Sequence, residues 1–180
     1  MEGGQSIPSS ASRPHHCHID TRYLLALLLG EDWDRDVFAS VHSLVTPPSH
    51  GEIEVSLVAV GEAFTKIAAE NLQPRRSDRP PLERWLRMVR EGALSICWGD
   101  HHDSRSDVLD LARQVRDRSP GVGPADCLIV ATALACVSCT QLLTTDRRLL
   151  TNVNLRKFSE GRRRGLRASD SESVAGGGRE

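Results

Sequence analysis

Short apolar runs alternate along this chain with longer stretches in which apolar residues recur at helical spacing. The short runs predict strands at residues 16–19, 53–56, 94–98 and 141–144, with a further short edge strand at 154–158. The longer stretches predict helices at 22–29, 34–45, 57–71, 81–90 and 107–118, and from 124 onward. This alternation predicts an α/β sandwich with a parallel sheet of four to five strands and helices on both faces.

Residues that favour helix ends support these boundaries. Gly30 offers a stop for the first helix, Ser56 can cap the third, and Pro81 can occupy the first turn of the fourth. The fourth helix is expected to turn its apolar side chains inward, namely Leu82, Trp85, Leu86 and Val89.

Length and composition indicate one globular domain. The chain has 180 residues, of which 39% are hydrophobic, so the core is adequate. We expect a flexible arm at 1–13, the folded domain at 14–158 and a disordered tail at 159–180, which is rich in Arg, Gly and Ser. The net charge of −1 excludes a polycation that coats nucleic acid, so any such contact needs a local patch.

The cysteines and the apolar runs bear on location. Five cysteines without a signal peptide predict reduced thiols in the cytoplasm. The longest apolar run, Tyr23–Leu29, is too short to cross a membrane.

Two groups of residues suggest a zinc site: the stretch from His15 to His18, and Cys136 with Cys139. Zinc needs four ligands at ordered spacing, but Cys17 and His18 point to opposite faces of a strand, and the cysteine pair has no second pair. We therefore expect buried thiols here rather than zinc.

Four acidic residues occupy similar places in the predicted elements. Asp20 and Asp146 directly follow strands, Glu62 lies in the first two turns of a helix, and Asp126 opens another helix. Ligands collect beyond the carboxyl ends of parallel strands, so we expect these side chains to converge. Carboxylate oxygens suit Mg²⁺ or Mn²⁺, which can activate water and stabilise charge on a phosphodiester.

At these residues the sequence resembles the PIN-domain family of metal-dependent nucleases, and above all its small VapC-type toxins. The resemblance covers about residues 15–158. The stretches that carry it are Ile19-Asp20-Thr21 with Tyr23–Leu29, Val60-Gly61-Glu62-Ala63, the run from Asp126 to Leu134, and Leu143-Thr144-Thr145-Asp146.

The resemblance implies a PIN-like three-layer sandwich with the strand order 3-2-1-4-5. It also implies Mg²⁺ or Mn²⁺ as cofactor, RNA as substrate, a homodimer, and a possible antitoxin protein as partner. Glu62 would ligate the metal or orient the attacking water, and three residues would ligate it directly or through water, namely Asp20, Asp126 and Asp146.

Four further residues are candidates near these acids. Thr144 would help to fix a carboxylate. Thr21 could do the same or cap its helix, and we expect it to be the cap. Arg147 and Arg148 follow Asp146 and either contact substrate phosphate or form a solvated helical turn.

The predicted function is therefore a metal-dependent endoribonuclease, the toxin of a toxin–antitoxin pair. The alternative is a non-catalytic module of the same fold that binds RNA or serves as a scaffold. A phosphatase of the haloacid-dehalogenase type is disfavoured, because it needs Asp-x-Asp after the first strand and this chain has Asp20-Thr21-Arg22.

Overall fold

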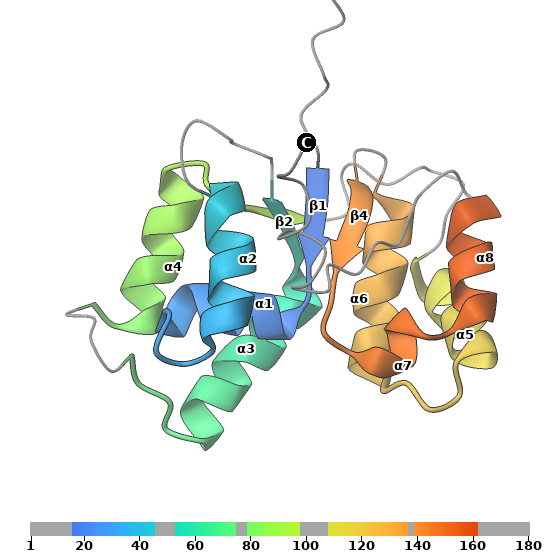
Figure 1. Ribbon diagram of the computed structural model, residues 1–180, viewed down its shortest axis with the longest axis horizontal. Coiled ribbons are helices and arrows are strands. Elements are labelled where there is room, and N and C mark those ends of the chain that lie inside the picture. The colour runs from blue at the N-terminus through green and yellow to red at the C-terminus, as the bar shows by residue number, and fades with distance from the viewer. Residues whose placement is uncertain (1–15, 46–52, 75–78, 98–107, 137–138, 162–180) are drawn as a thin grey trace, which may run out of the picture.

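A parallel sheet of four strands forms the centre of the computed structural model, which describes residues 16–45, 53–74, 79–97, 108–136 and 139–161 (Figure 1). The strands are β1 (His16–Ile19), β2 (Ile53–Ser56), β3 (Ser95–Cys97) and β4 (Cys139–Leu143), in the order β3-β2-β1-β4. All neighbouring pairs are parallel. The predicted α/β class and the 3-2-1-4 part of the predicted order are confirmed.

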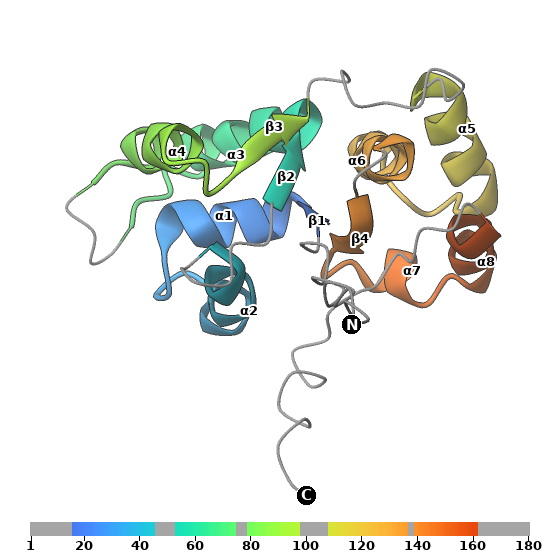
Figure 2. The ribbon, with the colours of Figure 1, turned by 90° about the horizontal axis from the view of Figure 1, so that it is seen from above.

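Helices cover both sides of this sheet. They are α1 (Thr21–Leu29), α2 (Arg35–Val45), α3 (Leu57–Ala69), α4 (Pro81–Arg90), α5 (Val108–Arg118), α6 (Pro124–Ala135), α7 (Arg147–Leu150) and α8 (Val153–Gly161). Figures 1 and 2 show α1 and α2 on one side of the central strands and α5 and α6 on the other. Because both faces are covered, β2 is buried along its whole length.

Helix α1 is the most deeply buried helix at the sheet's carboxyl end. Every one of its residues except Arg22 is buried, as expected for a helix that is apolar around its whole circumference. It ends at Gly30, whose φ of +90° is a conformation that favours glycine. Its N-cap is Asp20, whose side chain accepts from the amides of Arg22 and Tyr23. The expected capping role of Thr21 is therefore wrong, because the preceding carboxylate occupies the cap position.

The predicted edge strand at 154–158 is also wrong, because these residues belong to α8. Leu155 and Ser159 are buried, and the ring of Phe158 packs 4.2 Å from the guanidinium carbon of Arg118 in α5. Residues at spacings of three and four share one helical face, which here docks on α5. Within the described residues the sheet therefore has four strands.

Helix α4 departs from the expected inward face. Trp85 is buried and meets Phe64 of α3 edge to face, with the ring centroids 6.3 Å apart. Leu82 and Leu86, in contrast, are 55% and 50% exposed, so their predicted burial is wrong. Of the four apolar residues expected to face inward, Trp85 is buried and Val89 packs half-buried against the core.

Some sequence predictions fall outside the described residues. The predicted arm at 1–13 and residues 162–180 of the predicted tail lie there, whereas residues 159–161 are helical in α8. No helix in the described ranges is both long and apolar enough to cross a membrane. All five cysteines are buried, as expected, and none of them forms a disulfide bond.

Candidate functional site

Asp20 joins the carboxyl ends of the two central strands. Its backbone amide donates to the Leu143 carbonyl of β4 at 3.0 Å. Its Oδ2 accepts from the Thr145 amide at 3.2 Å, and the Thr144 hydroxyl is a further partner of the same carboxylate. Burial raises the pKa of Asp20 in spite of these hydrogen bonds, which act in the opposite direction. Asp20 is thus held in one orientation by α1 and by the residues that follow β4.

Glu62 is tied to the same place through Thr21. The Thr21 hydroxyl donates to Glu62 Oε2 at 2.6 Å, across from α1 to α3. Glu62 Oε1 lies 3.3 Å from Nζ of Lys66, one turn further along α3. Thr21 therefore fixes the Glu62 carboxylate instead of capping α1.

Asp146 caps the short helix α7 and is held by its neighbours. Its amide donates to Thr144 Oγ1 at 3.1 Å, and its carboxylate accepts from the Arg148 amide at 2.8 Å. The Arg148 guanidinium also donates to both carboxylate oxygens, at 2.6 Å from Nη2 and 3.0 Å from Nε. This charged, bidentate contact lowers the pKa of Asp146.

Asp126 lies in the first turn of α6 and completes the arrangement. Burial raises its pKa most, and the negative charges of Glu62 and Asp146 raise it further. Arg148 opposes this rise, with Nη2 3.9 Å from Asp126 Oδ2. A side chain at Gly123 would bring a Cβ within 3.1 Å of the same oxygen, so the lack of one there leaves room for this carboxylate.

These contacts define a carboxylate group, which consists of Asp20, Glu62, Asp126 and Asp146. Hydrogen bonds of Thr144 and Thr145 connect Asp20 to the segment that carries Asp146. Thr21, which follows Asp20 in the chain, bonds to Glu62. Its members come from four elements that meet at the carboxyl end of the sheet, toward which the arrows of β1 and β4 point in Figure 1.

The carboxylate group offers only oxygen atoms, which fits the preference of Mg²⁺ or Mn²⁺. The mutual repulsion that raises the pKa of Asp126 is what a bound cation would relieve. The oxygens of the four carboxylates nevertheless do not form a compact ligand set, and the Arg148 guanidinium is paired with Asp146. Arg147, the other predicted substrate contact, is exposed.

A different set of side chains forms the compact group. Among the described residues, the group whose metal-ligating atoms all lie within 4.8 Å of one another consists of His18, Glu54, Cys97 and Cys136. In the sequence, His18 and Cys136 belong to two separate groups of candidate zinc ligands. Glu54 and Cys97 carry no such signal, because only the pairing of the strands brings these four elements together.

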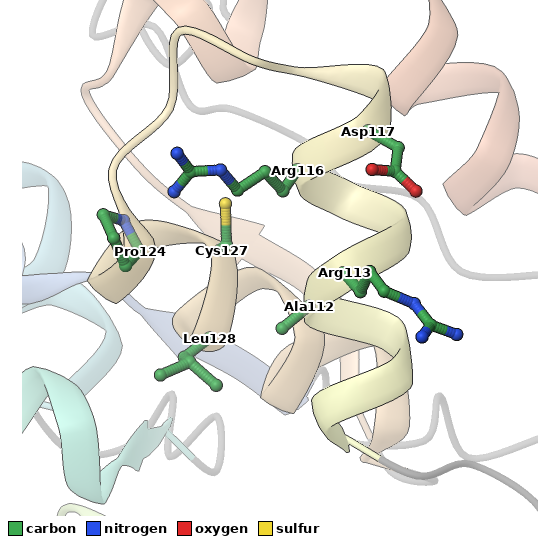
Figure 3. A pocket seen from close by; sticks show the side chains of 7 residues that line it. All are labelled: Ala112, Arg113, Arg116, Asp117, Pro124, Cys127 and Leu128. Carbon is green, nitrogen blue, oxygen red and sulfur yellow. The ribbon is translucent and has the colours of Figure 1, made fainter.

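A hollow of about 390 Å³ lies between α5 and α6 (Figure 3). Arg116 reaches across it toward Pro124 and lies near Cys127. Its lining consists of Ala112, Arg113, Arg116, Asp117, Pro124, Cys127 and Leu128. No member of the carboxylate group lines this hollow, so it is separate from the candidate site.

Comparisons with known proteins show similarity to solved structures. No protein-family model matches the chain, and no curated protein matches it. A solved structure of VapBC2 from Rickettsia felis, bound to a DNA fragment from their promoter, aligns with a TM-score of 0.48 and 14% sequence identity. The alignment covers 78% of this chain and 95% of that one. A similarity of this size leaves function to be argued from the site itself.

Proposed function

We propose that this protein is a metal-dependent endoribonuclease of the PIN-domain class and the toxin of a toxin–antitoxin pair in the cytoplasm. One observation carries the proposal: four carboxylates from four separate elements meet at the carboxyl end of a parallel sheet, where two of them raise the pKa of a third. Such crowding is costly for folding and is useful where a cation must be bound.

In this proposal the carboxylate group holds Mg²⁺ or Mn²⁺. The bound cation supplies Lewis-acid activation of water and neutralises charge that develops on the phosphodiester. Asp20 contributes an orientation fixed by the amides of Arg22, Tyr23 and Thr145. Glu62, positioned by Thr21, either shares in binding the cation or orients the attacking water.

Arg148 has two roles in this proposal. Without metal, it compensates the charge of Asp146 and partly that of Asp126. Its side chain is 59% exposed, so it can exchange Asp146 for a substrate phosphate once a cation takes over the carboxylate. Arg147 is exposed beside it and is a second candidate for phosphate contact.

We further propose that the active form is a homodimer and that a small antitoxin protein blocks it. The sequence resemblance to VapC-type toxins supports this part of the proposal. Co-expression with the product of a neighbouring reading frame, followed by copurification and by relief of RNA cleavage, tests the antitoxin. Light scattering on the purified chain tests the dimer.

The central experiment is cleavage of total RNA by the full-length chain with Mn²⁺, with cut sites mapped by end sequencing. Asp20→Asn and Asp126→Asn should each reduce cleavage by about 100-fold or more, because the loss of a group that only supports a metal ligand already costs up to about 100-fold. Asp110→Asn is the matched control, because Asp110 pairs with Arg113 of its own helix α5, at 3.0 Å. It should cleave like the unchanged protein.

Two outcomes contradict the proposal. One is intact RNA after incubation of the folded wild-type chain with Mn²⁺ or Mg²⁺. The other is RNA that binds equally well with EDTA and stays whole, which favours the non-catalytic module. Circular dichroism of each variant shows that a loss of cleavage is not a loss of fold.

A further inference from the structure

Four buried side chains from four elements converge between the sheet and α6. They are His18 of β1, Glu54 of β2, Cys97 of β3 and Cys136 at the C-cap of α6, with exposed fractions of 0%, 6%, 5% and 0%. One ligating atom from each lies within 4.8 Å of all the others. We call this set the buried ligand cluster; it shares no residue with the carboxylate group.

The register of the parallel strands explains how three of these residues meet. His18 and Glu54 are direct partners in the β1–β2 pair, so their side chains leave the same face of the sheet. Glu54 in turn is the partner of Ser95, and Cys97 lies two positions further along β3 on that face. Helix α6 packs against β2 and β4, and its C-cap brings Cys136 to this face.

The polar atoms of the cluster lie close together, but they do not satisfy the hydrogen-bonding capacity of His18. The Cys136 thiol donates to Glu54 Oε2 at 2.9 Å, and His18 Nε2 lies 3.0 Å from the same oxygen. The His18 imidazole nevertheless has no hydrogen-bond partner of good geometry at either ring nitrogen, although the residue is fully buried. A buried imidazole without a satisfied hydrogen bond is costly, and buried polar groups are as a rule paired or bound to a metal.

We propose that the buried ligand cluster binds one zinc ion with a structural role. Two thiolates, one imidazole nitrogen and one carboxylate oxygen are ligand types that zinc takes, and four protein ligands leave no open position for substrate. Magnesium and calcium prefer oxygen ligands alone, so the two sulfur atoms select against them. Binding releases the thiol protons of Cys97 and Cys136 to solvent and leaves their thiolates on the ion.

The ion would join β1, β2, β3 and α6 at one point in the interior. His18 lies two residues before Asp20, so zinc would also stabilise the strand on which α1 and the carboxylate group depend. The free energy of zinc binding then becomes part of the free energy of folding. This inference stands independently of the proposed nuclease function.

The test measures metal content in the full-length chain, expressed with zinc and purified under reducing conditions without chelator. Mass spectrometry of the metal should find one zinc per chain. Cobalt substitution should give the thiolate-to-cobalt charge-transfer band and the intense visible bands of a tetrahedral site. Cys97→Ser and Cys136→Ser should lose both signals. Cys127→Ser, which alters another buried thiol of α6 outside the cluster, should keep them.

A second measurement keeps the test valid if a variant does not fold. A strong chelator should lower the Tm of the unchanged protein by several degrees, and zinc, but not Mg²⁺ or Mn²⁺, should restore it. Zinc-free wild-type protein without a cobalt charge-transfer band overturns the proposal, as does equal zinc content in Cys97→Ser and Cys127→Ser. Asp20→Asn and Asp126→Asn should retain zinc, which separates this result from that for the nuclease.

Discussion

Asp126 and Asp146 have chemically identical side chains, but their surroundings shift the two pKa values in opposite directions. The guanidinium of Arg148 lowers the pKa of Asp146, while burial and two neighbouring carboxylates raise that of Asp126. Without metal, one arginine compensates two acids unequally: it lies 2.6 Å from an oxygen of Asp146 but 3.9 Å from one of Asp126. Ionisation of Asp126 therefore opposes folding, as does that of Asp20, whose pKa is raised by burial.

Replacing Asp126 by Asn should stabilise the metal-free protein at neutral pH. The raised pKa means that ionisation opposes folding, a penalty fully present above the folded pKa and absent below the unfolded value of about 3.9. We expect the Tm to rise by about 1–3 °C at pH 7, a small effect because solvent screens a partly exposed carboxylate. The difference should vanish as the pH falls to about 3.9.

Asp146→Asn is the matched comparison and should have the opposite sign. Because the pKa of Asp146 is lowered in the folded state, its ionised carboxylate stabilises the fold at pH values above the pKa of the unfolded state. This contribution is lost as the pH falls through the folded pKa. Thermal unfolding in EDTA at several pH values measures both variants. A lower Tm for Asp126→Asn at neutral pH would contradict this account of the group.

At the scale of elements, sequence patterns predicted most of the fold because the elements are short and end at residues with clear preferences. The bounds of β1, β2 and α4 are the predicted ones, and Ser56 caps α3 through its bond to the Ala59 amide at 3.1 Å. The strand prediction at 154–158 is wrong because Leu155 alternates with the preceding Val153 as in a strand, while Leu155 and Phe158 have helical spacing.

Part of the candidate site could likewise be predicted from the sequence, and part of it could not. The positions of the four acids at strand and helix ends follow from local patterns. The bond from Thr21 to Glu62 and the buried ligand cluster do not, because both depend on which strands pair and in which register. Glu54 in particular occupies an ordinary strand position in the sequence, and only its partner His18 shows what the side chain faces.

Asn152 caps the first turn of α8, and its replacement by Ala should destabilise the protein. Its Oδ1 accepts from the Leu155 amide at 2.9 Å, and its Nδ2 donates to Arg118 O at 3.0 Å and Ser119 Oγ at 2.7 Å. A lost cap costs about 1 kcal/mol, so we expect the Tm to fall by about 2–4 °C or more.

Asn154→Ala controls for the same substitution at an exposed position within α8. It should change the Tm by less than about 1 °C, as is usual for surface substitutions. Thermal unfolding followed by circular dichroism compares the two variants. Equal stability of both would show that Asn152 does not anchor α8 to α5.

At the scale of the whole molecule, the carboxylate group exists only when the parts of the chain on the two sides of the central strands come together. Asp20 and Glu62 belong to the part with α1 to α4, whereas Asp126 and Asp146 belong to the part with α5 to α8 (Figure 1). The β1–β4 pair joins these two parts. A cation bound by all four carboxylates therefore binds the folded chain and not the unfolded one.

Manganese should accordingly raise the Tm of the whole protein. A ligand at 100 times its Kd stabilises the folded state by about 2.7 kcal/mol, which for a chain of this size is a rise of about 5–10 °C. The rise should shrink in mild acid, at a higher pH than for an ordinary aspartate, because protons compete for Asp126, whose pKa is raised. Asp20→Asn and Asp126→Asn should abolish it, whereas Asp110→Asn should not. Calorimetric unfolding with and without Mn²⁺ measures the shift, and an unchanged shift in Asp126→Asn would mean that the ion binds elsewhere.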